Sequence, residues 1–356
     1  MYLIRGTNNI ELFRSNFPEI STVATIGNFD GLHLGHQQIL KTMQEEADIH
    51  RLKRLIIFTE PHAQEFFSEA AGMETSKPPR IFPWQEKVRK MKEFGVDFAF
   101  FLKFNNQLRS MTPEDFLNKI LLRLHIKKLV IGDDFRFGAN REGDFSLLKN
   151  WGTQNSIEVS NTETYEIDGE RVSSTRIREA LTENNFEKAN KLLGRPFTYS
   201  GKVVYGNQLG GQLGIPTANL WLPKNKLPIS GVYIVKALLD KKKLRGIANM
   251  GIRPTVGGDS PVLEVHLLNF SEKIDGKGDP GFLALSGNGR RQGGRLSRRF
   301  GLCWGRLYPG LRFWRRRFFP RQRCFLGSGR VLIVGARGAG RLGIGRRRLF
   351  RRTPED

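Results

Sequence analysis

Short apolar runs alternate with helix-like stretches through the first 185 residues, and this alternation restricts the fold more than any other feature. The runs Leu55–Phe58, Phe98–Phe101 and Leu129–Ile131 are typical of strands that are buried on both faces. Before the third run, Thr112 and Pro113 suit the N-cap and first turn of a helix that reaches Leu124. Repeated strand–helix units predict an α/β domain with a parallel sheet, whose ligands bind at the carboxyl ends of the strands.

The pattern changes after residue 185. Strands are predicted at 201–204, 231–239, 244–249 and 262–270, with turns rich in Gly, Pro and Lys between them. The stretch 239–243 is typical of a hairpin turn. This spacing of short strands predicts a small antiparallel barrel or sandwich.

A third region begins at Gly278 and accounts for most of the net charge of +23. Residues 278–356 contain 20 Arg, no Lys and three acidic residues, so they hold 17 of the 23 excess positive charges. Such a tail suggests an alternative function, the binding of nucleic acid or of an anionic membrane surface. Interleaved aromatic side chains favour this alternative; they are Trp304, Phe313, Trp314, Phe318 and Phe319.

The composition of this tail also favours disorder or aggregation over a third domain. We interpret it as the product of a reading-frame change or a fusion, which a comparison of all reading frames of the encoding DNA would test. The two cysteines, Cys303 and Cys324, provide neither a disulfide framework nor a metal site. Because the chain has no apolar run of 18 residues and no signal peptide, we expect a cytoplasmic protein without a membrane span.

The segment Thr25–His36 combines the end of an apolar strand, a glycine-bounded turn and two histidines spaced three residues apart. A helical pattern follows, so His33 and His36 are expected near a helix N-terminus. Exposed N–H groups and the helix dipole favour a phosphate there, and Gly35 leaves room for it to approach the backbone. The imidazoles can donate hydrogen bonds to a phosphoryl group that gains charge. A metal-binding pair or two surface histidines is the alternative, which the flanking turn Gly27–Gly31 disfavours.

Two further segments have residues suited to a nucleotide. In Val172–Arg178 a Ser or Thr can cap a helix, while hydroxyls, N–H groups and Arg176 converge on one end, as a triphosphate requires. Considered alone, this segment is better explained as an ordinary capped helix with surface arginines. Gly132–Gly138 follows a buried strand and therefore lies at the ligand end of the sheet. Its Phe135 and Phe137 fit a ligand-facing or a core position equally well.

Five more short motifs follow the same chain order: Phe58–His62, Gly214–Asn219, Gly231–Tyr233, Ala248–Thr255 and Leu263–His266. With the segments above, they resemble the bacterial bifunctional riboflavin kinase/FAD synthetase family over residues 1 to about 270. The resemblance implies a Rossmann-like nucleotidylyltransferase domain over 1–185 and a riboflavin-kinase-like β-barrel over 186–277. It also implies two ATP-dependent reactions with Mg²⁺, phosphorylation of riboflavin to FMN and transfer of AMP to FMN. Related transferases use pantetheine phosphate or nicotinamide nucleotide as acceptor, but the kinase-like half favours a flavin.

The resemblance also implies roles for individual residues. His33 and His36 would be catalytic and contact the ATP phosphates. Further ATP contacts would come from Gly27, Asn28, Phe29, Gly35, Ser174, Thr175 and Arg176, the last three at the pyrophosphate end. The flavin would lie near His62, Asp134, Phe135 and Phe137.

For the barrel, the resemblance implies that Thr217 and Asn219 hold the ATP–Mg²⁺ complex. Glu264 would be the general base for the ribityl hydroxyl, a role that suits a carboxylate. From the strand pattern alone, Glu264 is an outward charge that shares a face with Val262 and His266.

The sequence departs from the family near Gly278, where the expected last strand and closing helix of the barrel are replaced. A barrel without its last strand exposes an apolar edge and loses part of its flavin lid. We therefore expect an incomplete barrel, weak or absent riboflavin phosphorylation and intact adenylyl transfer. The tail, residues 278–356, is also expected to bind polyanions nonspecifically.

Overall fold

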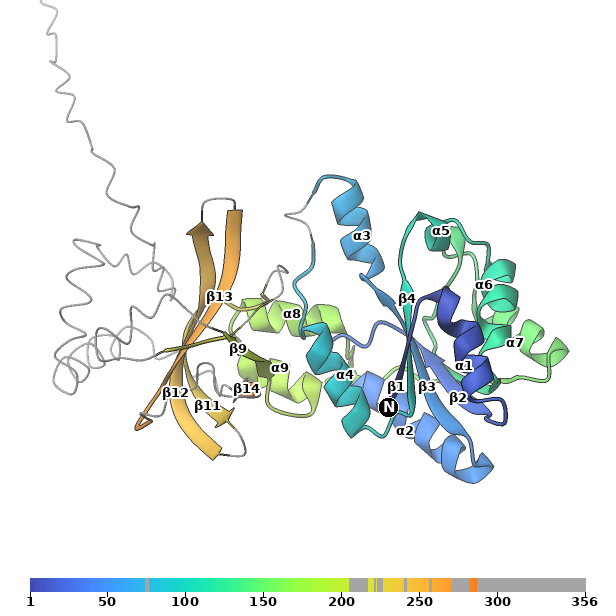
Figure 1. Ribbon diagram of the computed structural model, residues 1–356, viewed down its shortest axis with the longest axis horizontal. Helices are drawn as coiled ribbons and strands as arrows, with labels where there is room; N and C mark the ends of the chain where they lie inside the picture. Colours follow the sequence, from blue (N-terminus) through green and yellow to red (C-terminus); the bar gives the residue numbers. More distant parts are fainter. Residues whose placement is uncertain are drawn as a thin grey trace, which may run out of the picture. The chain divides into compact units, whose positions relative to one another are not determined.

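The computed structural model describes most of the chain up to residue 270 and one strand beyond it (Figure 1). The described residues are 1–73, 77–204, 217–220, 222, 227–239, 242–255, 258–270 and 282–286. The predictions made for the aromatic and cysteine residues of the tail lie outside these ranges.

Six parallel strands form the sheet of the N-terminal part, in the order β1-β4-β3-β2-β5-β6. They are β1 (Tyr2–Arg5), β2 (Thr22–Ile26), β3 (Lys53–Glu60), β4 (Phe98–Lys103), β5 (Ile126–Gly132) and β6 (Glu158–Thr162). The three strands predicted from apolar runs lie within β3, β4 and β5, so the α/β prediction is confirmed. From β4 the chain crosses to the other side of β2, which places a switch of strand order between β2 and β5. Open α/β sheets bind their ligands at such a point.

Helices cover both faces of this sheet, because apolar side chains alternate along its strands. Ile56 and Phe58 pack with α2 (Leu34–His50), α4 (Trp84–Glu93), α8 (Ser174–Thr182) and α9 (Phe186–Leu193). Leu55 and Ile57 pack with α1 (Ile10–Asn16), α6 (Pro113–Lys119) and α7 (Phe145–Gln154). The remaining short elements are α3 (Ala63–Ala70), α5 (Asn106–Arg109), the 3₁₀ turns Thr7–Asn9, Leu121–Arg123 and Ala139–Arg141, and the hairpin β7 (Glu166–Ile167) and β8 (Glu170–Arg171).

Helix α6 begins as predicted but ends early. The Thr112 hydroxyl accepts a hydrogen bond from the Asp115 N–H at 3.2 Å, and Pro113 occupies the first turn. The helix ends at Lys119 rather than Leu124, and a 3₁₀ turn follows it. The 3₁₀ turn has three residues per turn, so Leu121 and Leu124 lie on the same side of the chain, and both belong to the apolar cluster under the sheet.

The second part is an antiparallel barrel in the order β10-β13-β12-β11-β14-β9. Its strands are β9 (Thr198–Val204), β10 (Ala218–Leu220), β11 (Gly231–Leu239), β12 (Lys242–Thr255), β13 (Gly258–Leu267) and β14 (Phe282–Ser286). Along β11, Val235, Ala237 and Leu239 are buried, whereas the residues between them are exposed. This period of two confirms the strand prediction for 231–239.

The barrel is closed, which corrects the expectation that it lacks its last strand. Strand β14 comes from the Arg-rich region and pairs with Lys236–Leu239 of β11 and with Thr198–Lys202 of β9. Strand pairing uses backbone N–H and C=O groups, so a segment foreign to the family can still supply it.

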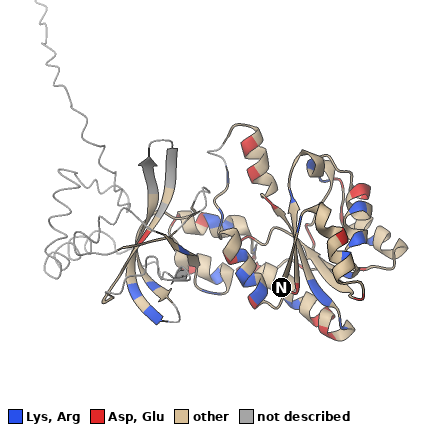
Figure 2. Cartoon of the chain, viewed as in Figure 1, with Lys and Arg blue, Asp and Glu red and all other residues tan. Residues whose placement is uncertain are grey.

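Acidic and basic side chains occur together on the helices of the α/β part (Figure 2). Several form pairs one helical turn apart, such as Lys119 with Asp115 at 2.8 Å. The strong positive excess therefore belongs to the tail rather than to this part of the chain. No helix among the described residues is both long and apolar enough to cross a lipid bilayer.

Candidate functional site

The two histidines lie at the start of α2, as predicted. His33 is the N-cap residue, and its Nδ1 accepts a hydrogen bond from the His36 N–H at 3.3 Å. The two rings stack with their centroids 3.6 Å apart and 17° between their planes. A Cβ at Gly35 would lie 3.3 Å from the His33 ring, so glycine is what allows this stacking. Nearly parallel rings do not direct their nitrogens at one common point, which argues against a metal-binding pair.

Both histidines are uncharged at neutral pH. Burial, together with Arg171 and other nearby cations, lowers the pKa of His33 to about 3. Burial and the neighbouring His33 also hold the pKa of His36 well below its ordinary value. Because Nδ1 of His33 accepts a hydrogen bond, its proton resides on Nε2, which can act as a donor. Nδ1 of His36 is buried and has no hydrogen-bond partner within the described structure.

Helix α8 brings the second predicted segment to the same place. Ser173 caps the helix by accepting a hydrogen bond from the Arg176 N–H at 3.3 Å. The Ser174 hydroxyl donates to the backbone carbonyl of Asp30 at 2.8 Å, across 144 residues of sequence. Arg176 donates to the carbonyls of Glu170 and Arg171 at 2.9 and 2.8 Å, so its side chain holds the β7–β8 hairpin. The structure thus joins the turn after β2 to the N-terminus of α8.

Asp30 is the centre of this junction, and the sequence analysis did not single it out. Its carboxylate is 1% exposed and accepts hydrogen bonds from the N–H groups of Ile81 and Phe82 at 3.2 and 3.4 Å. It also pairs with Arg178 of α8 at 2.7 Å, and Arg178 donates to the carbonyl of Pro79 at 2.8 Å. One buried carboxylate therefore fixes the turn, the segment before α4 and helix α8.

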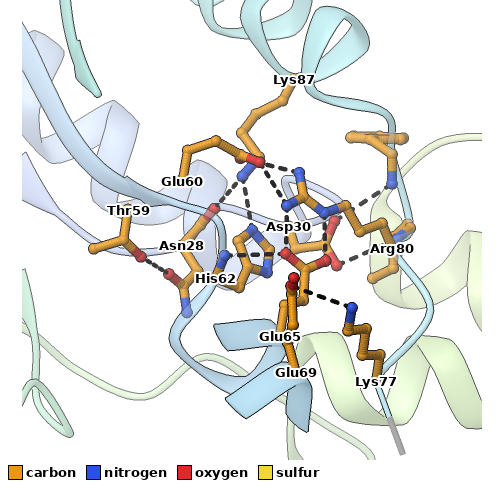
Figure 3. Close-up of polar contacts among 12 residues, drawn as sticks. Asn28, Asp30, Thr59, Glu60, His62, Glu65, Glu69, Lys77, Arg80 and Lys87 are labelled. Atoms are coloured by element: carbon orange, nitrogen blue, oxygen red, sulfur yellow. Dashed lines mark hydrogen bonds and ion pairs between the residues drawn. The ribbon is translucent and has the colours of Figure 1, made fainter. Parts of the chain in front are cut away.

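A second buried ion cluster lies beside it at the end of β3 (Figure 3). Arg80 donates two hydrogen bonds to Glu60 at 2.6 and 3.0 Å, and its Nε donates to Glu65 at 2.6 Å. Burial opposes the charge of Arg80, but the hydrogen bonds to Glu65 and Glu60 raise its pKa above the ordinary value. Glu65 also accepts from the His62 N–H at 3.1 Å.

His62, predicted to face the flavin, is enclosed by this cluster. It is 4% exposed, and its Nε2 lies 3.0 Å from Nζ of Lys87. Burial, followed by the charge of Lys87, lowers the pKa of His62 to about 2. The side chain is therefore a neutral part of the supporting structure in this conformation.

A groove of about 480 Å³ opens next to the start of α8. It is lined by Gln64, Phe67, Ser68, Pro78, Thr175 and Arg178. Phe67 is 45% exposed, packs edge-on against Phe66 and Phe104, and has Arg109 over its ring at 5.2 Å. Phe67 was not predicted from the sequence, because two adjacent phenylalanines in an amphipathic helix also fit a core.

Two aromatic rings of the predicted ligand-binding segments are buried in the core. Phe29 is fully buried and lies under the His36 ring, with centroids 5.0 Å apart. Phe137 is buried against Phe116, with centroids 5.5 Å apart. In both cases the backbone follows the ligand edge while the ring turns inward to cover apolar surface.

The other predicted ligand contacts remain at the surface of this edge. Phe135 is half-buried and stacks on Phe137. Asp134 is exposed and pairs with Arg171 at 2.5 Å. Asn28 is exposed and accepts a hydrogen bond from the Thr59 hydroxyl at 3.2 Å, next to Gly27.

In the barrel, the strand register brings two predicted residues together. Asn219 of β10 lies opposite Glu264 of β13, and Asn249 of β12 lies opposite Glu264 on the other side. The neighbouring residues Ala218 and Val265 are buried, so the polar set occupies the face away from the barrel core. Thr217 directly precedes β10 and is half-buried.

Comparison with known proteins identifies the family. Its models match residues 18–176 as FAD synthetase and residues 193–278 as riboflavin kinase. The bifunctional riboflavin kinase/FMN adenylyltransferase of Escherichia coli K12 is 42% identical over 280 residues, which cover 78% of this chain and 86% of that protein. This chain belongs to the bifunctional riboflavin kinase/FMN adenylyltransferase family. The family protein of Pseudomonas fluorescens is also 42% identical, over 76% of this chain and 84% of its own length.

The fold has a solved counterpart as well. The crystal structure of a macrolide-efflux protein from Streptococcus pneumoniae matches 81% of this chain and 90% of its own chain, with a TM-score of 0.63 and 28% identity. The family matches end at residue 278, where the Arg-rich region begins. They give no support to nucleic-acid or anionic-surface binding as the function of the chain.

Proposed function

We propose that this chain makes FAD in two steps, riboflavin phosphorylation in the barrel formed by β9 to β14 and adenylyl transfer in the α/β domain of residues 1–185. One observation supports the assignment of adenylyl transfer to the α/β domain. The Ser174 hydroxyl bonds to the carbonyl of Asp30, which joins the turn before His33 to the capped N-terminus of α8. Two helix N-termini and two neutral imidazoles then meet at the strand ends where α/β sheets bind ligands.

Adenylyl transfer needs charge stabilisation more than covalent chemistry. A phosphate oxygen of FMN attacks the α-phosphorus of ATP, the bond to the bridging oxygen breaks, and pyrophosphate leaves with the electron pair. We assign to His33 and His36 the donation of hydrogen bonds to the phosphates, supported by the low pKa values that keep both rings neutral. Neutral donors stabilise the transition state without binding the substrate charge too tightly. Thr175 and the α8 N-terminus are assigned to the pyrophosphate.

The flavin is assigned to the groove beside α8. Its lining combines the exposed ring of Phe67 with the hydroxyl of Thr175. An exposed aromatic ring is a suitable stacking surface for a planar ring system. Asp134 and Phe135, at the end of β5, extend the same ligand edge.

In the barrel, Glu264 is assigned as the general base that takes the proton of the ribityl hydroxyl. The hydroxyl oxygen attacks the γ-phosphorus of ATP, the bond to the bridging oxygen breaks, and ADP leaves with the electron pair. Thr217 and Asn219 offer oxygen ligands, the type that Mg²⁺ prefers, and Asn219 lies opposite Glu264. When bound with ATP, Mg²⁺ neutralises phosphate charge. The side chains therefore fit an ATP–Mg²⁺ complex next to the base.

Paired variants test both assignments in one protein. His33→Ala should reduce FAD formation from FMN by about 10²- to 10³-fold and leave riboflavin phosphorylation unchanged. Glu264→Gln should reduce riboflavin phosphorylation on the order of 10²-fold or more and leave FAD formation from FMN unchanged. Each variant is the control for the other, because His33 belongs to the α/β part and Glu264 to the barrel. Loss of both reactions in both variants, or of neither, would contradict the assignments.

Three earlier expectations stay predictions. The kinase step should be slower than adenylyl transfer, because the family match ends at residue 278 and the expected closing helix is replaced. A cytoplasmic location and nonspecific binding of polyanions by the tail are also retained. Salt-sensitive binding of heparin that disappears on removal of residues 287–356 would support the last of these.

A further inference from the structure

Lys87 is a buried cation that reaches two predicted ligand-binding segments at once (Figure 3). It lies in the first turn of α4, and its side chain is 1% exposed. Its Nζ donates to the backbone carbonyl of Asn28 at 2.8 Å and lies 3.0 Å from Nε2 of His62. The ammonium also lies over the ring of Phe58, 4.9 Å from its centroid. Lys87 thus links the segments that follow β2 and β3.

This ammonium has no ion-pair partner among the described residues. The nearby carboxylates already pair elsewhere, Glu60 and Glu65 with Arg80, and Asp30 with Arg178. Burial lowers the pKa of Lys87 to about 8, although Asp30 and Glu60 favour its charged form. A buried and unpaired cation destabilises a fold, and an apolar side chain of similar length would stabilise it more. Packing therefore gives no reason for a lysine at this position.

The location of the charge suggests its use. Lys87 fixes the carbonyl of Asn28, two residues before Asp30 in the turn that leads to His33. It is also near enough to His36 to lower the pKa of that ring. A cation behind this turn orients the Asn28 peptide and adds positive potential where the phosphates are assigned.

We propose that Lys87 is a positioning residue for adenylyl transfer, which couples the phosphate-binding turn to the flavin side of the site through Asn28 and His62. The inference rests on the proposed function of the α/β domain. Because Lys87 is enclosed, it acts through the backbone of the turn and through its charge, and it does not touch the substrates. The titratable or charged groups around it are Asp30 in the turn, His36 on α2, Glu60 on β3, His62 and Glu65 at α3, and Arg80 before α4.

The test uses the full chain with Lys87→Met, which keeps the length but removes the charge, and Lys87→Arg, which keeps the charge. Lys92→Met, on the exposed side of the same helix, is the control. Steady-state FAD formation from FMN and ATP is measured from pH 6.5 to 9.5, together with the melting temperature. We expect kcat to fall on the order of 10- to 100-fold in Lys87→Met, with an equal or higher melting temperature. Lys92→Met should match the unmodified protein.

The pH profile separates a positioning role from packing. FAD formation by the unmodified protein should decline above about pH 8, as Lys87 loses its proton. Lys87→Met should lack this decline. Lys87→Arg should recover part of the rate and should also lack the decline. If Lys87→Met keeps the unmodified kcat, the inference is wrong. It is also wrong if the alkaline decline is absent from the unmodified protein, and this second result does not require Lys87→Met to be purified. An unmodified protein that makes no FAD at any pH would instead contradict the proposed function.

Discussion

Replacement of Asp30 by asparagine should destabilise the α/β domain strongly, because this carboxylate has three donors around it. The N–H groups of Ile81 and Phe82 and the guanidinium of Arg178 all point at it. Asparagine has a single acceptor oxygen and an NH₂ group that would face one of these donors. Removing one partner of a buried ion pair costs about 3–5 kcal/mol. Because the Arg178 side chain is 15% exposed and keeps its bond to Pro79, we expect about 3 kcal/mol.

A double-variant cycle measures this effect by urea unfolding. Arg178→Met in the Asp30→Asn background removes the unpaired cation, so the double variant should lose about 1–2 kcal/mol less than the sum of the single variants. Amide hydrogen exchange at Ile81 and Phe82 should accelerate in Asp30→Asn, because their acceptor is weakened. Additive single effects, or a loss below about 0.5 kcal/mol for Asp30→Asn, would refute the assignment of Asp30 as the junction.

Three further predictions follow. The folded pKa of His33, about 3, lies below the unfolded value of 6.5, so its stabilisation is complete above pH 6.5 and declines towards pH 3. Well below pH 6.5 this approaches about 1.4 kcal/mol per pH unit, so the loss of unfolding free energy between pH 7.5 and pH 5.5 should be about 1.4 kcal/mol smaller in His33→Asn. Gly35→Ala should slow FAD formation, because the added Cβ displaces the His33 ring. The melting temperature should not fall, because alanine favours the helix. An unchanged rate of FAD formation would contradict a role for the stacked histidine pair. A chain that ends after Ser286 should retain the full-length kinase rate, whereas one that ends at residue 281 should lose it and keep adenylyl transfer, because β14 pairs with both β9 and β11. Equal kinase rates in the two truncated chains would contradict closure by β14.

Local signals in the sequence predicted the elements that carry the site. The cap at Thr112, a Ser or Thr cap within Val172–Arg178 and the helix after His33 depend on residues within one turn of each other, so they can be predicted directly. The parallel sheet followed from buried runs in the same way. The structure then places the predicted turn after β2 at the switch of strand order.

Contacts between distant segments could not be predicted in this way. Asp30 and Arg178 are 148 residues apart, and Lys87 lies 59 residues from Asn28. Nothing near Lys87 in the sequence distinguishes it from Lys90 and Lys92 of the same helix, which are less buried. Phe29 and Phe137 show a second limit, since a motif indicates the path of the backbone but not whether a ring faces the core. Closure of the barrel by β14 was missed because strand pairing requires little of the side chains.

The most direct test of the account is a single incubation of the purified full-length protein with ATP, Mg²⁺ and FMN, or with riboflavin in place of FMN. The flavins are then separated by chromatography. We expect FAD from FMN, with slower formation of FMN when riboflavin is supplied. No FAD from FMN would contradict the assignment of the His33–His36 site to adenylyl transfer.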